Sequence, residues 1–98
     1  MVDLAPSVHA KSMIGLPERL TMAEASATLA RLAPLLQAAT DPVLDASALR
    51  EMDTAALALL LACQRQAAGQ GRRLQLTGAP PKLKQLAQLY GVDALLGL

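Results

Sequence analysis

The chemistry that this sequence could perform is concentrated at one point. The segment 52–66, MDTAALALLLACQRQ, sets a carboxylate and a hydroxyl, Asp53 and Thr54, directly before nine apolar residues. Either side chain could cap a helix by accepting hydrogen bonds from the N–H groups of its first turn, which stabilises a helix by about 1 kcal/mol. The pair could instead be a site that a partner contacts and that a phosphate, with about −1.5 to −2 charges, would switch. The pattern alone leaves both interpretations open.

Other catalytic residue types are sparse. Cys63 lies inside the apolar run, and the single histidine, His9, lies in a segment without any hydrophobic period. A nucleophilic thiol needs access and a lowered pKa, and a metal site needs several clustered ligands, so neither is expected. The segment 69–73, GQGRR, lacks the spacing of a phosphate-binding loop. We therefore predict that the protein is not an enzyme and that it holds no cofactor and no metal.

Composition narrows the remaining classes. The chain has 98 residues, a formal net charge of +1 and an aromatic content of 1%. That length supports one domain with a modest core. Because base stacking needs aromatic rings and phosphate binding needs positive charge, no nucleic-acid partner is expected. The apolar run is about half of the ~20 residues that a membrane span needs, and the N-terminus has no long apolar segment. A cytoplasmic protein without direct membrane insertion is expected.

The elements that would position Asp53 and Thr54 alternate between strand and helix. Apolar stripes at helical spacing predict three helices, at 22–38, 54–68 and 81–90. Short apolar runs predict strands over 12–17 and at 43–44, and alternation of polar and apolar residues predicts a half-solvated third strand over 72–78. This order favours an α/β domain with a small mixed or parallel sheet and helices packed on it. The domain would span 12–98 behind a loose N-terminal arm, 1–11, with an additional strand in 5–12 left open.

Residue types also predict where these helices begin, bend and end. Thr21 and Glu24 have the spacing of a capping box at the start of the first helix. Pro34 would kink or end that helix just before itself, because an interior proline costs about 3 kcal/mol. Glycines would end the other two helices, at 69–71 and at Gly91. The inward stripe of the last helix is expected to consist of Leu83, Leu86, Ala87 and Tyr90.

The helix that follows Asp53 has more apolar surface than a sheet requires. Residues 55–63 are apolar all round, whereas a helix that lies on a sheet needs one apolar stripe. The excess predicts a second surface that covers the helix, such as a partner chain, and small alanines would allow that partner to approach closely. The residues predicted to bind a partner or to regulate binding are Asp53, Thr54, Ala55, Ala56 and Leu57.

The stretch 43–92, VLDASALREMDTAALALLLACQRQAAGQGRRLQLTGAPPKLKQLAQLYGV, resembles a STAS domain, the fold of the anti-sigma-factor antagonists. It runs from a strand into a loop, then DT at a helix start, a leucine-rich helix, a strand and an amphipathic helix. Its DT, its LALLL at 57–61 and its LAQLYG at 86–91 are similar to the small STAS subunits of the Mla phospholipid-transport ABC system, the MlaB-like proteins.

This resemblance implies a STAS-like fold and a non-catalytic accessory subunit. Such a subunit binds the ABC ATPase, joins the permease in a larger complex, and supports the assembly and activity of a system that maintains outer-membrane lipid asymmetry. It would be cytoplasmic and peripheral to the inner membrane through that complex. The resemblance also implies that Thr54 corresponds to the threonine that the family has at the start of this helix.

The resemblance leaves two alternatives. The first is an anti-anti-sigma-type regulator that is switched by phosphorylation of Thr54, and the second, weaker one is an orphan STAS module of a larger sensor. Many relatives have glycine shortly after this threonine, and this chain has Ala55 and Ala56. The extra methyl groups narrow access to the helix start, which disfavours recognition by a kinase more than docking of a subunit. Weak self-association is left open.

Overall fold

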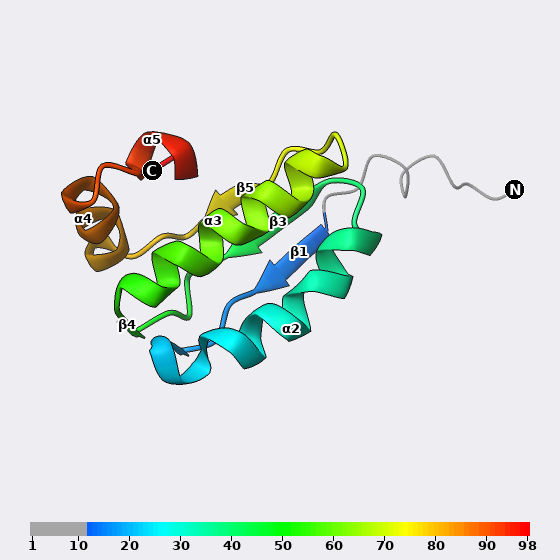
Figure 1. Cartoon of the computed structure of the whole chain (residues 1–98). Helices are drawn as coiled ribbons and strands as arrows, with labels where there is room; N and C mark the ends of the chain where they lie inside the picture. The colour runs from blue at the N-terminus through cyan, green and yellow to red at the C-terminus, as the bar shows by residue number, and fades with distance from the viewer. Residues whose placement is uncertain (1–11) are drawn as a thin grey trace, which may run out of the picture.

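The computed structural model describes residues 12–98, and its centre is a parallel sheet of three strands (Figure 1). The strand β3 (Pro42–Asp45) lies in the middle and pairs in parallel with β1 (Ser12–Gly15) and with β5 (Gln75–Thr77). The predicted α/β class is confirmed, and the sheet is parallel. The predicted arm, 1–11, and the part of the additional strand before Ser12 lie outside the described residues.

In the described part of the chain, four helices cover or flank this sheet. They are α2 (Met22–Ala38), α3 (Thr54–Gly69), α4 (Pro81–Leu89) and α5 (Asp93–Leu96). The two long helices, α2 and α3, lie side by side in front of the three strands, and α4 and α5 lie together beside α3 (Figure 1). The three predicted helices are confirmed to within one residue at each end.

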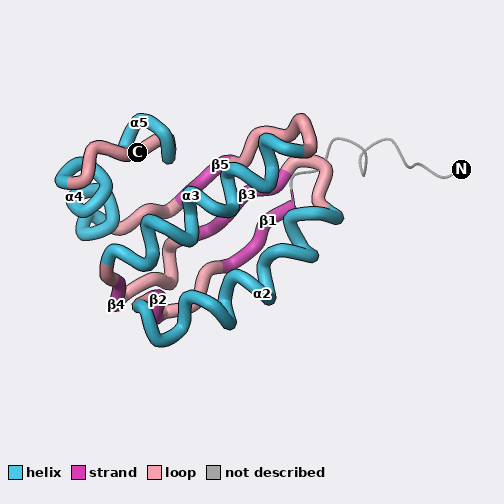
Figure 2. The backbone as a smooth tube through the Cα atoms, in the orientation of Figure 1, coloured by secondary structure: helices cyan, strands magenta, loops and turns pink. Residues whose placement is uncertain are grey.

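A second, two-stranded parallel sheet lies at the end of the molecule where the long helices begin (Figure 2). Its strands are β2 (Arg19–Leu20) and β4 (Glu51–Met52). Two residues are too short to show any period, so the sequence did not predict these strands. Because β2 leads into α2 and β4 leads into α3, their pairing sets the two helix starts next to each other.

The core lies between the three-stranded sheet and the helices. It is built of aliphatic side chains, because the described residues contain one aromatic side chain, Tyr90. The largest side chains that are fully buried are Leu20, Leu32, Leu36, Leu44, Leu60 and Leu83, with Pro42 and Cys63. Burial of a leucine contributes about 1.5–3 kcal/mol, so these residues dominate the stability of the domain.

The helix α2 begins with the predicted capping box and continues through its proline. The Thr21 hydroxyl accepts a hydrogen bond from Ala23 N at 3.3 Å, and Thr21 N donates to Glu24 Oε1 at 2.9 Å. Of the two outcomes predicted for Pro34, an end of the helix is wrong, because the chain stays helical to Ala38.

The helices α3 and α4 end at glycines, as predicted. Gly71 and Gly91 both have a φ of 70°, in the left-handed region that favours glycine. The residue after each glycine then donates a backbone hydrogen bond to the last turn, from Arg72 N to Ala67 O at 2.9 Å and from Val92 N to Ala87 O at 2.9 Å. This is the Schellman arrangement.

One member of the predicted inward stripe of α4 is wrong. Leu83 and Ala87 are buried and Leu86 is half-buried, but Tyr90 is 57% exposed. The helix ends at Leu89, so Tyr90 stands at the cap, where the chain turns away from the stripe. The following segment, α5, returns to the body of the domain and buries Leu96.

Candidate functional site at the start of helix α3

One carboxylate, that of Asp53, caps both long helices. Its Oδ1 accepts a hydrogen bond from Ala55 N at 2.8 Å, and its Oδ2 accepts one from Met22 N, at the start of α2, at 3.1 Å. A negative charge at a helix N-terminus is favoured by the exposed N–H groups and by the helix dipole. The capping interpretation of the sequence pattern therefore applies to Asp53.

Thr54 is the first residue of α3 and is exposed. The Asp53 side chain accepts the hydrogen bond that caps α3. Within residues 12–98, the Thr54 hydroxyl makes no hydrogen bond. The two residues therefore have separate roles, although they are adjacent. The hydroxyl stands at the surface beside a carboxylate that already occupies Ala55 N, so an anion docking on that N–H group would have to displace Asp53.

The other three predicted site residues divide between surface and core. Ala55 is half-buried and faces α2, whereas Ala56 and Leu57 are 0% and 4% exposed. Ala56 and Leu57 therefore fix the position of the helix start from inside the domain. The structure brings Asp53, Thr54 and Ala55 together at the surface.

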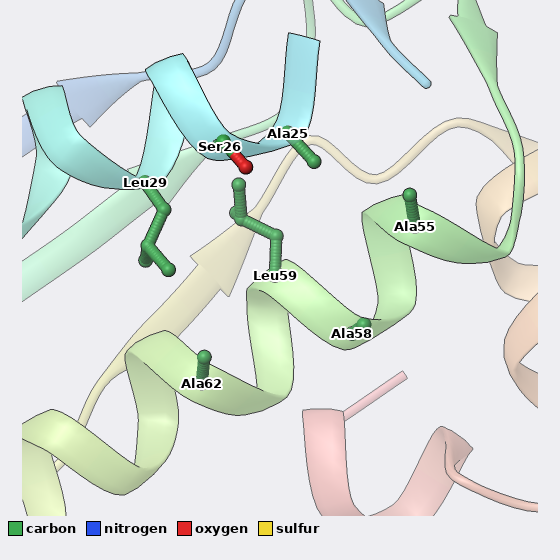
Figure 3. Close-up of a pocket in the computed structure, with 7 residues that line it drawn as sticks. All are labelled: Ala25, Ser26, Leu29, Ala55, Ala58, Leu59 and Ala62. Atoms are coloured by element: carbon green, nitrogen blue, oxygen red, sulfur yellow. The ribbon is translucent and has the colours of Figure 1, made fainter. Parts of the chain in front are cut away.

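A shallow apolar groove runs between α2 and α3 next to this helix start (Figure 3). Its volume is about 200 Å³. The lining residues are Ala25, Ser26 and Leu29 from α2 and Ala55, Ala58, Leu59 and Ala62 from α3. Ala58 is exposed, and Ala55 and Ala62 are half-buried, so the described residues leave part of the apolar surface of α3 uncovered, as predicted.

Charged side chains lie beside the helix starts. Arg19 lies 3.8 Å from a carboxylate oxygen of Glu24 and 3.8 Å from one of Glu51. The hydrogen bond from the Thr21 hydroxyl to Glu24, together with Thr21 N and the charge of Arg19, lowers the pKa of Glu24 below its ordinary value. These pairs are solvent-exposed and contribute little to stability.

Sequence reasoning missed the contribution of α2 to this surface. Met22 is 79% exposed directly beside Asp53, and Ala25, Ser26 and Leu29 form one wall of the groove. The sequence did contain one signal of this surface, a large apolar residue, Met22, at the first position of a helix. The wall itself could not be found from the sequence, because it depends on the pairing of two helices that are distant in the chain.

The other nucleophilic and metal-ligating groups of the described residues are buried or scattered. Cys63 is buried, and burial raises the pKa of its thiol to about 11, so the thiol is protonated near neutral pH. Within residues 12–98, no group of three or more His, Cys, Asp or Glu side chains could hold a metal ion. Nor does that part of the chain contain a helix long and apolar enough to cross a bilayer.

Three solved structures share this fold. An anti-sigma-factor antagonist (STAS) domain protein from Planctomyces limnophilus has a TM-score of 0.73 at 17% identity, covering 85% of this chain and 76% of that one. A sulfate transporter family protein from Wolinella succinogenes has a TM-score of 0.71 at 18% identity, covering 89% and 71%. The anti-sigma factor antagonist SpoIIAA in its unphosphorylated form has a TM-score of 0.68 at 17% identity, covering 90% of each chain.

Sequence comparison identifies the family. No curated protein sequence was found to match the chain. A family model described as "Mlab, STAS domain" matches residues 6–97, which is nearly the whole sequence. That range contains the three-stranded sheet, Asp53 and Thr54 at the start of α3, and the closing amphipathic helix, and the chain therefore belongs to the STAS domain family.

Proposed function

We propose that this STAS domain is a non-catalytic accessory subunit that binds the ABC ATPase of a phospholipid-transport system and supports its assembly and activity. The observation that carries the proposal is the match of residues 6–97 to a family model described as "Mlab, STAS domain". In this proposal the chain is cytoplasmic and is held at the inner membrane through the transporter complex, which serves the lipid asymmetry of the outer membrane.

The surface at the start of α3 supports this proposal on physical grounds. Its groove is lined mostly by alanines, whose short side chains lose little conformational entropy when a partner covers them. Met22 adds an adaptable apolar side chain at one edge. Stable interfaces commonly bury about 800 Å² on each partner, so the contact would extend from the groove across the exposed side of α3.

Thr54 is the residue of this surface with the clearest test. A glutamate at position 54 would set a second carboxylate beside Asp53. That new carboxylate would lose its hydrating water inside an apolar contact, and Asp53 would repel it. Thr54→Glu should therefore lower affinity for the ATPase about tenfold or more, which corresponds to about 1.4 kcal/mol. The domain should stay folded, because Thr54 is exposed and does not make the cap.

The experiment is a calorimetric titration of the ATPase subunit from the same genome with purified wild-type and variant domains. Thr40→Glu is the matched control, since Thr40 is an exposed threonine in the loop at the far end of α2. Thermal melting would confirm that each variant is folded. Wild-type affinity in a folded Thr54→Glu protein would remove Thr54 from the interface, and absence of any wild-type binding would refute the proposed function.

A second candidate is an anti-anti-sigma-type regulator that is switched by phosphorylation of Thr54. It is supported by the exposed, unbonded hydroxyl at the helix start and by the similarity to SpoIIAA. This function predicts that a switch kinase adds phosphate to Thr54, that mass spectrometry locates it there, and that Thr54→Val abolishes it. Capture of an anti-sigma kinase in place of a transport ATPase would favour this candidate.

A further inference from the structure

A second groove lies between α3 and α5. Its volume is about 330 Å³, and its lining residues are Leu61, Gln64, Arg65, Ala68 and Leu95. It shares no lining residue with the groove beside Thr54, which is lined by α2 and by a neighbouring face of α3. The exposed side of α3 is therefore flanked by two hollows, of which the sequence had indicated neither.

The leucine that α5 contributes to this groove is held in an exposed position. Leu95 is 62% exposed, whereas the next residue, Leu96, is 3% exposed and anchors the short helix in the core. Gly97 closes the turn with a φ of 72°, and Leu98 N donates to Asp93 O at 2.8 Å. Across the groove, Leu61 is half-buried. Two apolar side chains thus line a hollow that no described residue covers.

The groove also carries a positive charge. Arg65 is exposed and forms no salt bridge within residues 12–98, where both salt bridges belong to Arg19. Two adjoining hollows share Gln64 with this groove, and one of them also shares Ala68. Both are lined by Arg73, and the latter is also lined by Arg72. No Asp or Glu lines any of these three hollows. The flank of α3 therefore combines apolar and cationic groups without an internal counter-charge in its lining.

The cationic flank is part of a separation of charge along the chain. Residues 12–53 contain six Asp or Glu side chains and three arginines, whereas residues 54–98 contain five Lys or Arg side chains and one carboxylate, Asp93. The net charge of +1 conceals this division. Arg65 therefore belongs to the segment with a positive excess, and Asp53 belongs to the segment with a negative excess.

We propose that the groove between α3 and α5 binds an acidic segment of the same ATPase subunit, with a carboxylate of that segment on Arg65 and an apolar side chain between Leu61 and Leu95. The inference rests on the proposed function, because it assigns the segment to that partner. A protein segment fits better than a bilayer, since the surface is concave, and better than nucleic acid, since phosphates would leave the leucines uncovered and no aromatic ring lines the groove.

The first test is a titration of the ATPase with charge-reversed variants. Arg65→Glu should weaken binding about tenfold at low ionic strength, and the difference from wild type should shrink as salt screens the charge. Lys84→Glu makes the same change in net charge at an exposed position of α4 that does not line the groove, and it should bind as wild type. Equal affinities for Arg65→Glu and Lys84→Glu would overturn the inference.

The second test identifies the segment by crosslinking. In a Leu95→Cys variant, a maleimide photo-crosslinker should react at the new surface thiol, because Cys63 is buried and its thiol is protonated. The crosslinked ATPase peptide should contain Asp or Glu next to a large apolar residue. A crosslink to a second copy of this chain would assign the groove to self-association. Binding to phosphatidylglycerol vesicles that is lost in Arg65→Glu would assign it to a lipid surface. Either result would overturn the inference.

The two proposals fail in distinguishable ways. If the wild-type domain does not bind the ATPase, the proposed function is wrong and this inference falls with it. If the wild-type domain binds and Thr54→Glu weakens binding while Arg65→Glu does not, the proposed function stands and the inference alone is wrong.

Discussion

At the scale of single residues, Asp53 and Thr54 show how neighbouring side chains with similar helix-capping potential take different roles. The Asp53 carboxylate bonds to backbone N–H groups of two helices, at Ala55 and Met22. Thr54 is one position further along, inside the helix, where its hydroxyl faces solvent. The cap is therefore structural, and the hydroxyl is left available for function.

This division predicts unequal effects on stability. Asp53→Ala should lower the free energy of unfolding by about 1–2 kcal/mol, since two helix starts lose their acceptor. Asp53→Asn should keep the cap of one helix and lose that of the other, because an amide has a single accepting oxygen for the two N–H groups. Thr54→Ala should change stability by less than about 0.5 kcal/mol, as expected for an exposed side chain. Urea unfolding of the three variants measures these differences, and a larger loss for Thr54→Ala than for Asp53→Ala would contradict this assignment of the cap.

A glycine after β5 is required by close approach as well as by its backbone conformation. Gly78 has a φ of 70°, and a Cβ there would lie 2.9 Å from Asp45 Oδ1 and 3.1 Å from Ser47 N. That carboxylate oxygen accepts a hydrogen bond from Ser47 N at 3.0 Å, a bond that lowers the pKa of Asp45. An added methyl group would disturb the loop that joins β3 to β4.

Gly78→Ala should therefore destabilise the domain more than Gly71→Ala. Gly71 also has a φ of 70°, but a Cβ there would meet no atom within 4 Å, so it tests the backbone cost alone, about 1–2 kcal/mol. The additional loss in Gly78→Ala would report the clash. Thermal and urea unfolding of both variants would measure it, and equal losses would show that the loop relaxes freely.

At the scale of elements, α2 and α3 are tied together at both ends. The β2–β4 pair and Asp53 join their starts. Toward the other end, Gln66 Nε2 donates to Ala33 O at 2.8 Å, and the Arg72 guanidinium donates to Gln37 O at 2.8 Å and to Ala39 O. The groove beside Thr54 therefore lies between two helices whose spacing is fixed, so the partner surface is formed before binding.

The capping box of α2 predicts a specific dependence on pH. The pKa of Glu24 is lowered in the folded state from its ordinary value of 4.5, first by the Thr21 hydroxyl. A lowered carboxyl pKa contributes stability that is present above the unfolded pKa and is lost as pH falls through the folded pKa. Melting temperature should therefore fall below about pH 4.5, and Glu24→Gln and Thr21→Ala should each flatten that fall. Unchanged slopes in both variants would contradict the capping contribution.

At the scale of the whole molecule, the leucines are of two kinds: buried leucines that stabilise the core and exposed leucines on the surface. Leu60 is 1% exposed within the core, and Leu95 is 62% exposed at the groove beside α5. Both are helical leucines in apolar sequence, and only their tertiary surroundings separate them. The small aliphatic core makes each buried leucine a large share of total stability.

Truncation of these two leucines should separate stability from binding. Leu60→Ala should lower the free energy of unfolding by about 2–5 kcal/mol, because it leaves a cavity in the core. Leu95→Ala should leave unfolding within about 0.5 kcal/mol of wild type. Denaturant unfolding measures both, and a large loss for Leu95→Ala would show that this side chain supports the fold.

The local features of this protein follow from its amino-acid order alone. The helices at 22–38, 54–68 and 81–90, the capping box at Thr21 and the glycine stop at Gly91 were predictable, because hydrophobic period, capping and left-handed glycine act within a few residues. The succession of these elements indicated the α/β class, and the motifs after residue 43 indicated the STAS family.

Which side chains meet across the molecule depends instead on its three-dimensional packing. The β2 and β4 strands are too short to show a pattern, yet their pairing lets Asp53 reach Met22. The same holds for both grooves, whose walls come from helices far apart in the chain, such as α2 and α3 at Leu29 and Ala62. A residue's type and spacing fix what it can do locally, whereas exposure and partners depend on packing between distant segments, which no local pattern contains.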